Sequence, residues 1–161
     1  MRFFRPVPRI ALAAPEHASE LAEVLRAAWE PHRAQLSDAL WEELTPAPAE
    51  VAAWLRGGFE VYRVSYENKP VGAVRVAFPT GACVLDRLAV TPEQRRRGFG
   101  EYIAEHALSR ARRAGAGRVW ACVPEGVIEG LRLFRKLGFT QMSVQEGSLR
   151  PGRVVLLDRA L

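Results

Sequence analysis

A loop at residues 95–100 carries the residue types best suited to binding chemistry. Gly98 and Gly100 stand at the start of an Ala- and Arg-rich helical pattern, just after the apolar run Leu85–Val90. Glycine leaves the backbone bare, so an anion can reach the amides that a first helical turn cannot satisfy internally. The helix dipole and the three arginines of the loop add positive charge. The pattern predicts a site for a ligand with several phosphates, unless the glycines only permit a tight turn beside a solvated basic face.

Two better-known phosphate-binding motifs do not fit this loop. The dinucleotide fingerprint needs a third glycine in phase and an acidic residue further along the chain. The nucleotide-triphosphate loop needs Gly-Lys followed by Ser or Thr. Neither pattern is present here, so a Rossmann fold and a P-loop fold are not indicated.

The surrounding sequence gives the loop a family context. The spacing Arg95-x-x-Gly98-x-Gly100, after the run Leu88–Pro92, resembles the acetyl-CoA motif Gln/Arg-x-x-Gly-x-Gly/Ala of the GNAT acyltransferase superfamily. A second block, Leu131–Phe139, resembles the aliphatic-Tyr-x-x-x-Gly-Phe end of a later helix in that family. The resemblance implies an α/β, single-domain GNAT-like fold over residues 1–161, in which residues 1–9 could form an N-terminal extension.

Hydrophobic periodicity predicts the elements that position these motifs. A short strand at Ile10–Ala13, an amphipathic helix at Ala18–Trp29, a broken helical region over 36–55 and a hairpin of Glu60–Tyr66 with Val71–Phe78 make up the first half. Strand and helix then alternate over Val84–Val90, Phe99–Ala114, Arg118–Val123 and Val127–Leu137, before a final hairpin of Thr140–Glu146 with Arg153–Leu157. Such alternation implies parallel pairing, so we expect a mixed sheet with antiparallel N-terminal strands, a central parallel pair and flanking helices.

The family resemblance implies where acetyl-CoA would bind. The cofactor would lie where the strands Val84–Val90 and Arg118–Val123 splay apart, with its pantetheine arm along the backbone of the first strand. The amide of Leu88 would stabilise the oxyanion, and the loop would hold the pyrophosphate. The expected cofactor-binding residues are Leu88, Ala89, Val90, Arg95, Arg96, Arg97, Gly98, Phe99, Gly100 and Phe134.

Asp86 is the candidate base, because it is the only acid in an apolar strand next to the expected thioester. A lysine-like amine has a pKa near 10.4, so a base would help to deprotonate it for direct transfer. The alternative is a structural carboxylate paired with Arg75 or Arg87. Glu60 and His32 are weaker candidates for the same role.

Phe134 departs from the family pattern, which often has a proton-donating tyrosine at that position. A thiol titrates near 8.5, so the CoA thiolate can leave near neutral pH and take a proton from solvent. The family's common asparagine at the start of this helix is also replaced, by Val127.

Composition bounds the remaining possibilities. The chain has 161 residues, 48% of them hydrophobic, which suits one domain with a core. Its formal charge of +5 comes from arginines scattered along the chain, so nucleic-acid binding is not expected. Cys83 and Cys122 lie in apolar runs and predict small core residues without a disulfide. Charges and prolines interrupt Met1–Ile10, and no segment is long enough to span a membrane, so a cytoplasmic protein is expected.

Three functions follow from these observations. The first is an N-acetyltransferase that moves the acetyl group of acetyl-CoA directly to a primary amine, without a metal, in a ternary complex. Its acceptor, a small molecule or a peptide, would bind against residues 32–55 and 146–152, and the family also allows a homodimer. The second is a non-catalytic acyl-CoA sensor, supported by Phe134. The third is a nucleic-acid module using Arg110, Arg112 and Arg113 together with the loop arginines 95–97.

Overall fold

The structure is a computed structural model that describes residues 6–146 and 153–161. Its strands are β1 (Arg9–Leu12), β2 (Glu60–Tyr66), β3 (Lys69–Ala77), β4 (Ala82–Val90), β5 (Arg118–Pro124), β6 (Thr140–Glu146) and β7 (Arg153–Ala160). Its helices are α1 (Ala18–Trp29), α2 (Asp38–Leu44), α3 (Pro48–Arg56), α4 (Phe99–Arg113) and α5 (Ile128–Lys136). Short 3₁₀ turns are η1 (Pro15–His17), η2 (Glu30–Gln35) and η3 (Pro92–Gln94).

Within these residues one mixed sheet of seven strands runs in the order β1-β2-β3-β4-β5-β7-β6. β4 and β5 pair in parallel, and the other neighbours are antiparallel. The predicted fold class, the central parallel pair and the final hairpin are therefore confirmed. The sequence did not predict that β7 would lie between β5 and β6. The expected extension at residues 1–9 falls mostly on residues 1–5, which lie outside the described residues, and Arg9 already belongs to β1.

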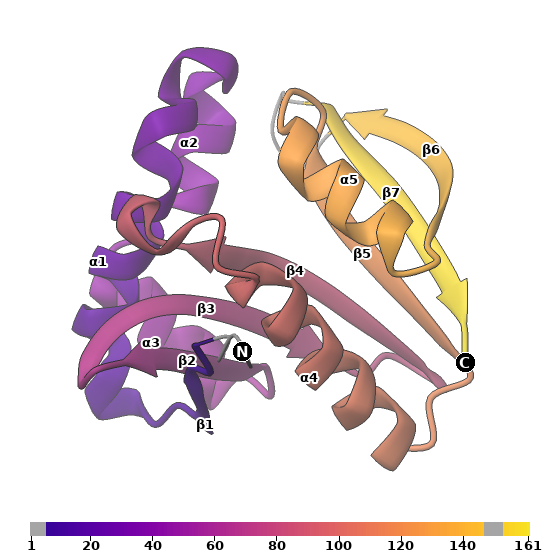
Figure 1. The fold of residues 1–161 in the computed structure, drawn as a ribbon, viewed down its shortest axis with the longest axis horizontal. Coiled ribbons are helices and arrows are strands. Elements are labelled where there is room, and N and C mark those ends of the chain that lie inside the picture. The colour runs from indigo at the N-terminus through magenta and orange to yellow at the C-terminus, as the bar shows by residue number, and fades with distance from the viewer. Residues whose placement is uncertain (1–5, 147–152) are drawn as a thin grey trace, which may run out of the picture.

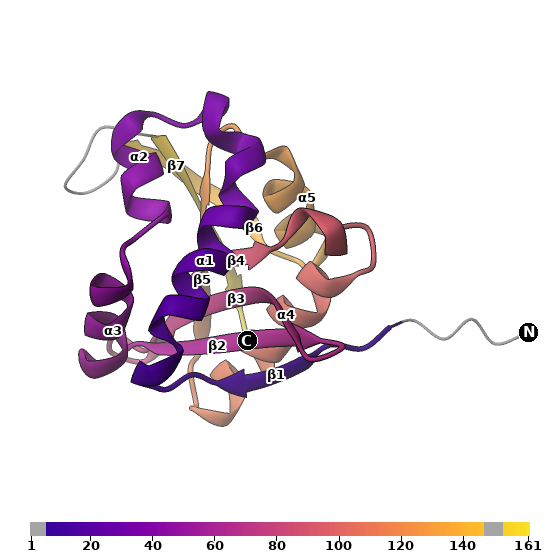
Figure 2. The same ribbon diagram turned by 90° about the vertical axis from the view of Figure 1, so that its left-hand side faces the viewer.

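Helices cover both faces of the sheet (Figures 1 and 2). Neighbouring residues of a strand point to opposite faces. In β2, Arg63 forms an ion pair with Glu20 of α1, whereas the ring of Tyr62 contacts His106 of α4. Thus α1 lies on one face and α4 on the other. The core between them includes fully buried Val74 of β3 and other small and branched apolar side chains.

Local sequence signals explain where the helices near the site begin. Ser37 caps α2, its hydroxyl accepting a hydrogen bond from the Leu40 amide at 3.2 Å. Pro48 opens α3, where its missing N–H costs nothing. Gly98 precedes α4 with φ at +81°, a left-handed conformation that side chains other than glycine rarely adopt. Among the described helices, none has the length and apolar character needed to cross a membrane.

Candidate active site

The central parallel pair separates part-way along its length. β4 and β5 pair only as far as Leu85, which lies opposite Ala121. Beyond this point β4 continues to Val90 paired only with β3, and β5 continues to Pro124 paired only with β7, among the described strands. Figure 1 shows the two ribbons starting together near the C-terminus and then diverging. The predicted splay between these strands is therefore present.

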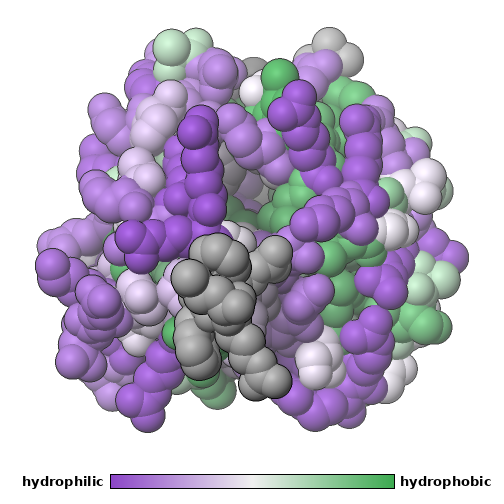
Figure 3. Space-filling model, in the orientation of Figure 1, coloured by the Kyte–Doolittle hydropathy of each residue, from purple (hydrophilic) through white to green (hydrophobic). Residues whose placement is uncertain are grey.

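A cleft of about 670 Å³ occupies this opening. The strands β4 and β5 form its floor, α4 and α5 border it on one side, and α1, η2 and α2 border it on the other. In space-filling form the surface is hollowed between these two sides, and the rim is mostly hydrophilic (Figure 3). The predicted site residues that line it are Asp86, Leu88, Ala89, Val90, Arg95, Arg96, Gly98, Phe99, Gly100 and Phe134.

A β-bulge shapes the part of β4 that faces the cleft. Ala89 lies opposite Ala73 of β3, and Asp86 lies opposite Arg75, so two residues of β4 face one residue of β3. The first of the two bulged residues, Arg87, has φ at +50°. A bulge bends its strand and increases the local twist. Here it lies at the point where β4 leaves β5.

The glycine loop joins this strand to α4. Gly98 has no atom within 4 Å of the position that a Cβ would occupy, so the space beside it is open. A Cβ on Gly100 would lie 3.4 Å from Leu133 of α5 and 3.9 Å from Leu88 of β4, and would therefore narrow the cleft. α4, a helix of 15 residues, begins directly after Gly98. Its free amides and dipole suit an anion.

The three arginines of the loop differ in what they contact. The Arg95 guanidinium donates to the carbonyls of Ala28 and Val90, at 2.5 and 3.3 Å, and so ties the loop to α1 and to the end of β4. Arg96 is exposed and lines the cleft. Arg97 does not line the cleft, and its guanidinium lies over the ring of Tyr66 at 5.7 Å. Of the three, Arg96 has the side chain best placed to meet a phosphate.

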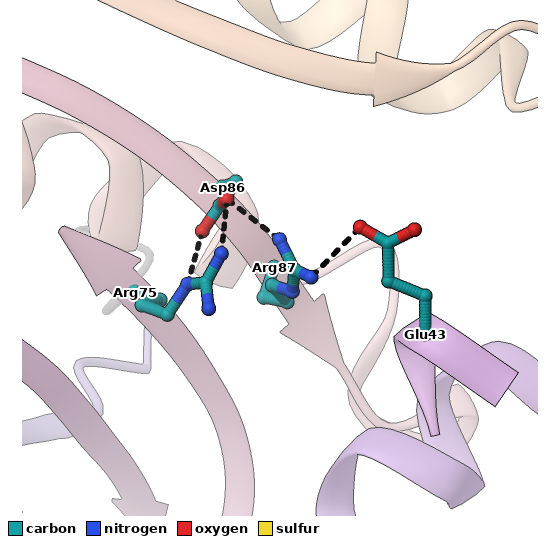
Figure 4. Close-up of polar contacts among 4 residues, drawn as sticks. All are labelled: Glu43, Arg75, Asp86 and Arg87. Atoms are coloured by element: carbon teal, nitrogen blue, oxygen red, sulfur yellow. Dashed lines mark hydrogen bonds and ion pairs between the residues drawn. The ribbon is translucent and has the colours of Figure 1, made fainter. Parts of the chain in front are cut away.

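Asp86 lies within a row of alternating charges (Figure 4). Its two oxygens accept hydrogen bonds from Arg75, at 2.8 and 2.7 Å, and one of them also accepts from Arg87 at 2.7 Å. Arg87 donates in turn to Glu43 of α2 at 3.0 Å. The Arg75 guanidinium also lies over Trp54, at 4.6 Å. These are the ion pairs that the structural alternative for Asp86 predicts.

The two weaker candidates for a base lie in different places. Glu60 points away from the cleft, where it accepts two hydrogen bonds from Arg110 of α4 and one from Tyr62. His32 lines the cleft, and its Nδ1 lies 3.0 Å from the Gln35 side-chain oxygen. Of these two candidates, only His32 lines the cleft.

Phe134 of α5 and Cys122 of β5 also line the cleft. Phe134 is buried and packs edge-to-face against Phe139, with ring centroids 5.1 Å apart. Cys122, the first β5 residue beyond the paired segment, lines the cleft, and burial raises the pKa of its thiol to about 11. The prediction that both cysteines are core residues holds for Cys83, which is fully buried, but not for Cys122, which is only partly buried and faces the cleft.

The sequence that forms this cleft matches a known family. A profile of the acetyltransferase (GNAT) family matches residues 20–139, about three quarters of the chain. The chain belongs to the GNAT family. It is therefore an acyltransferase of the acetyl-transferring type, and both the resemblance and the fold expected from its motifs are confirmed.

Solved structures support the GNAT fold over the whole chain. The GCN5-related N-acetyltransferase from Rhodopseudomonas palustris is 18% identical with a TM-score of 0.81, each chain covered completely. The PaiA N-acetyltransferase from Thermoplasma acidophilum, solved with coenzyme A, is 16% identical with a TM-score of 0.77, over 96% of this chain and 99% of that one. A ribosomal-protein-alanine N-acetyltransferase from Brucella melitensis is 20% identical with a TM-score of 0.75, over 95% and 99%. No protein of curated function matches the sequence.

Sequence reasoning expected residues 32–55 on the acceptor side of the GNAT cleft, but it did not single out the residues that line this side. Trp29, Leu40 and Glu43 line the cleft there, although none belongs to a motif. Glu43 lies 44 positions from its partner Arg87, so only the fold brings them together. Within residues 6–146 and 153–161 no three His, Cys, Asp or Glu side chains cluster closely enough to hold a metal ion. The expected acceptor loop at 146–152 lies almost wholly outside the described residues.

Proposed function

We propose that this GNAT protein transfers the acetyl group of acetyl-CoA directly to a primary amine in a ternary complex. The observation that carries the proposal is the cleft between the diverging β4 and β5, which opens onto a glycine loop at the start of α4. In the reaction the amine nitrogen bonds to the acetyl carbonyl carbon and loses a proton. The carbon–sulfur bond breaks, and the thiolate leaves with the electron pair.

The residues present fit acetyl-CoA. Gly100 keeps open a space between Leu88 and Leu133 that a side chain would fill, and Gly98 leaves the loop backbone uncovered. We assign the pyrophosphate to the loop amides and Arg96, and the pantetheine arm to the β4 backbone at Leu88–Val90. Arg95 would hold the loop in place through its two carbonyl contacts. Bound there, acetyl-CoA supplies an activated acetyl group.

The bulge in β4 supports a role for the Leu88 amide in the reaction. A bulge frees one residue from the regular ladder between strands and turns its backbone. Leu88 is one of the two bulged residues, and it lines the cleft. An N–H donor fixed in this way would stabilise negative charge that develops on the acetyl oxygen during transfer.

Asp86 fits the role of a positioning residue better than that of a base. Its two oxygens already accept three hydrogen bonds from two guanidinium groups, which leaves little of the carboxylate free to bind an amine proton donor. Both pairs are largely shielded from solvent, with the Asp86 side chain 15% exposed. We assign to Asp86 the task of fixing Arg75 and Arg87 beneath the cleft. The alternative role, that of a base, predicts a different response to mutation of Arg75 and Asp86.

Gly100→Val tests the cofactor site. A valine would place methyl groups between Leu88 and Leu133, and we expect calorimetric titration to detect no binding of acetyl-CoA. Gly117→Val is the matched control, because a Cβ there meets nothing within 4 Å and the residue lies outside the cleft. It should bind as the unmodified protein does. Undiminished affinity in Gly100→Val would refute the assignment of the loop.

A second function, acyl-CoA sensing without transfer, is favoured by Phe134, because the buried ring offers no proton to a leaving thiolate. A sensor would bind acetyl-CoA and release no thiol in the presence of amines. Transfer is still compatible with phenylalanine at this position, since the thiolate is stable enough to leave near neutral pH. Measuring thiol release separates the two functions.

A further inference from the structure

The acceptor side of the cleft contains one carboxylate that is only partly engaged. Along the row of charges from the sheet to α2, the side-chain exposures are 11% for Arg75, 15% for Asp86, 12% for Arg87 and 37% for Glu43. The row thus starts at Arg75, which does not line the cleft. It ends at Glu43, its most exposed member, which lines the cleft wall. A ligand entering from solvent would meet Glu43 first.

The hydrogen bonds of Glu43 leave capacity for a ligand. Asp86 receives three hydrogen bonds from two arginines, whereas within the described part of the chain Glu43 has a single contact, of 3.0 Å, from Arg87 to one carboxylate oxygen. Figure 4 shows its second oxygen directed away from Arg87. An ionised carboxylate offers about four lone-pair sites. Arg87 therefore fixes the Glu43 side chain in position and leaves much of its accepting capacity unused.

The wall around Glu43 is apolar. Trp29, Leu40 and Leu44 line the same side of the cleft, and each is buried. They come from α1 and α2, and the Ser37 cap at the start of α2 helps to set the position of that helix. A ligand that places a cation on Glu43 would therefore lay the rest of its body against an aromatic ring and two leucines.

The charges near this wall set the number of ammonium groups it can accept. On the part of the cleft formed by α1, η2 and α2, Glu43 is the only acidic residue among those described. The nearby Asp86 is already paired with Arg75 and Arg87. A second ammonium placed against this wall would find no other carboxylate among the described residues of α1, η2 and α2, and a carboxylate on the acceptor would be repelled by Glu43. One positive charge is what this site can match.

We infer that Glu43 binds the ammonium group of the acceptor, and that the acceptor is a primary monoamine carried on an apolar body. This inference rests on the proposed acetyl transfer and gives its substrate a chemical class. Glu43 is here a binding residue that selects the acceptor. Loss of the amine's proton is a separate step, for which no residue is assigned.

The test uses three amines and two variants of the full chain saturated with coenzyme A. Calorimetry would compare phenylethylamine with 1,5-diaminopentane, which adds a second ammonium and lacks the ring, and with phenylalanine, which adds a carboxylate. Phenylethylamine should bind most tightly. Glu43→Gln keeps an oxygen for Arg87 but removes the charge, and should weaken phenylethylamine binding about 10- to 100-fold, as expected for a hydrogen bond to a charged group. Glu42→Gln is the control, because Glu42 is an exposed acid of α2 directly before Glu43. This variant should bind phenylethylamine as the unmodified protein does.

The outcomes separate this inference from the proposed function. Unchanged amine affinity in Glu43→Gln, or tighter binding of the diamine or of phenylalanine, would overturn the assignment of Glu43 and leave acetyl transfer standing. If none of the three amines binds, the assignment of Glu43 is overturned as well. Failure of the unmodified protein to bind coenzyme A would instead overturn the proposed function. Both Gln variants should bind coenzyme A with unchanged affinity, which shows that the cleft is intact.

Discussion

The ion pairs of Asp86 determine what its carboxylate can do. From sequence, a lone acid in an apolar strand predicts either a base or a structural partner of a nearby arginine. The two readings could not be separated because the outcome depends on register, which places Arg75 directly opposite Asp86 across β3 and β4. With Arg75 and Arg87 both bound to it, most of the hydrogen-bonding capacity of the carboxylate is taken up within the fold.

A double-mutant cycle on Arg75 and Asp86 tests this role. Urea unfolding of Arg75→Gln, Asp86→Asn and the double variant should give a coupling energy of about 1–3 kcal/mol, because the pair is in direct contact and shielded. If Asp86 only positions Arg75 and Arg87, the double variant should recover part of the transfer rate lost in Asp86→Asn, with the pH profile unchanged. A base would show the opposite: no recovery, and loss of the acidic limb of the profile.

The reactivity of Cys122 tests the environment of the cleft floor. Burial raises the pKa of this thiol to about 11, with Asp86 contributing in the same direction. Only about one molecule in a thousand should then carry the thiolate at pH 8. Iodoacetamide labelling followed by mass spectrometry should be slow at pH 7 and about tenfold faster per pH unit up to pH 9. Bound coenzyme A should protect the residue, since it lines the cleft.

Cys122→Ser identifies the labelled site, because Cys83 is fully buried and should react only after unfolding. Fast labelling of Cys122 at pH 7 would contradict the partly buried, neutral thiol described for this strand. It would point to an activated cysteine instead.

Among the elements, the contact between β3 and β4 holds the cofactor strand in position. A Cβ on Gly72 of β3 would lie 2.6 Å from the Ala89 carbonyl oxygen and 3.2 Å from Ile103 of α4. The first of these is a backbone atom and cannot move aside as a side chain could. Gly72 thus lets β3 approach β4 directly behind the segment assigned to the pantetheine arm.

Gly72→Ala should lower the free energy of unfolding by about 1–3 kcal/mol, the usual cost of overpacking. It should also weaken acetyl-CoA binding, because β4 must shift to relieve the contact. Gly117→Ala, at an open position, should change stability by no more than about 0.5 kcal/mol. Urea unfolding and calorimetry would check both effects. Unaltered stability in Gly72→Ala would mean that the two strands are less closely packed than described.

Most helices and strands could be predicted from hydrophobic periodicity, but the order of the strands in the sheet could be predicted only in part. The helix predicted at Ala18–Trp29 has those bounds in the structure, and the hairpin of β2 with β3 differs only at its ends. Periodicity reports which face of an element is apolar, but it says little about which strands become neighbours. The place of β7 beside β5 was therefore not predictable, and neither was the meeting of Glu43 with Arg87.

For the whole molecule, internal ion pairs argue against a nucleic-acid surface that depends on Arg110. The net charge is +5, yet several arginines are neutralised by partners within the fold. Arg110, which a basic α4 surface would require, forms a two-point ion pair with Glu60 and lies over Phe78. Internal pairing of this kind reduces the charge left to attract phosphates of a nucleic acid.

The central claim, acetyl transfer to an amine, is tested most directly by measuring thiol release from acetyl-CoA. The purified protein would be mixed with acetyl-CoA and a panel of amines, including phenylethylamine, a polyamine and a peptide with a free N-terminus. We predict amine-dependent release of one thiol for each acetylated amine found by mass spectrometry. Binding of acetyl-CoA without release across the panel would contradict the transferase and favour a sensor, and absence of binding would show that the cofactor site is wrongly assigned.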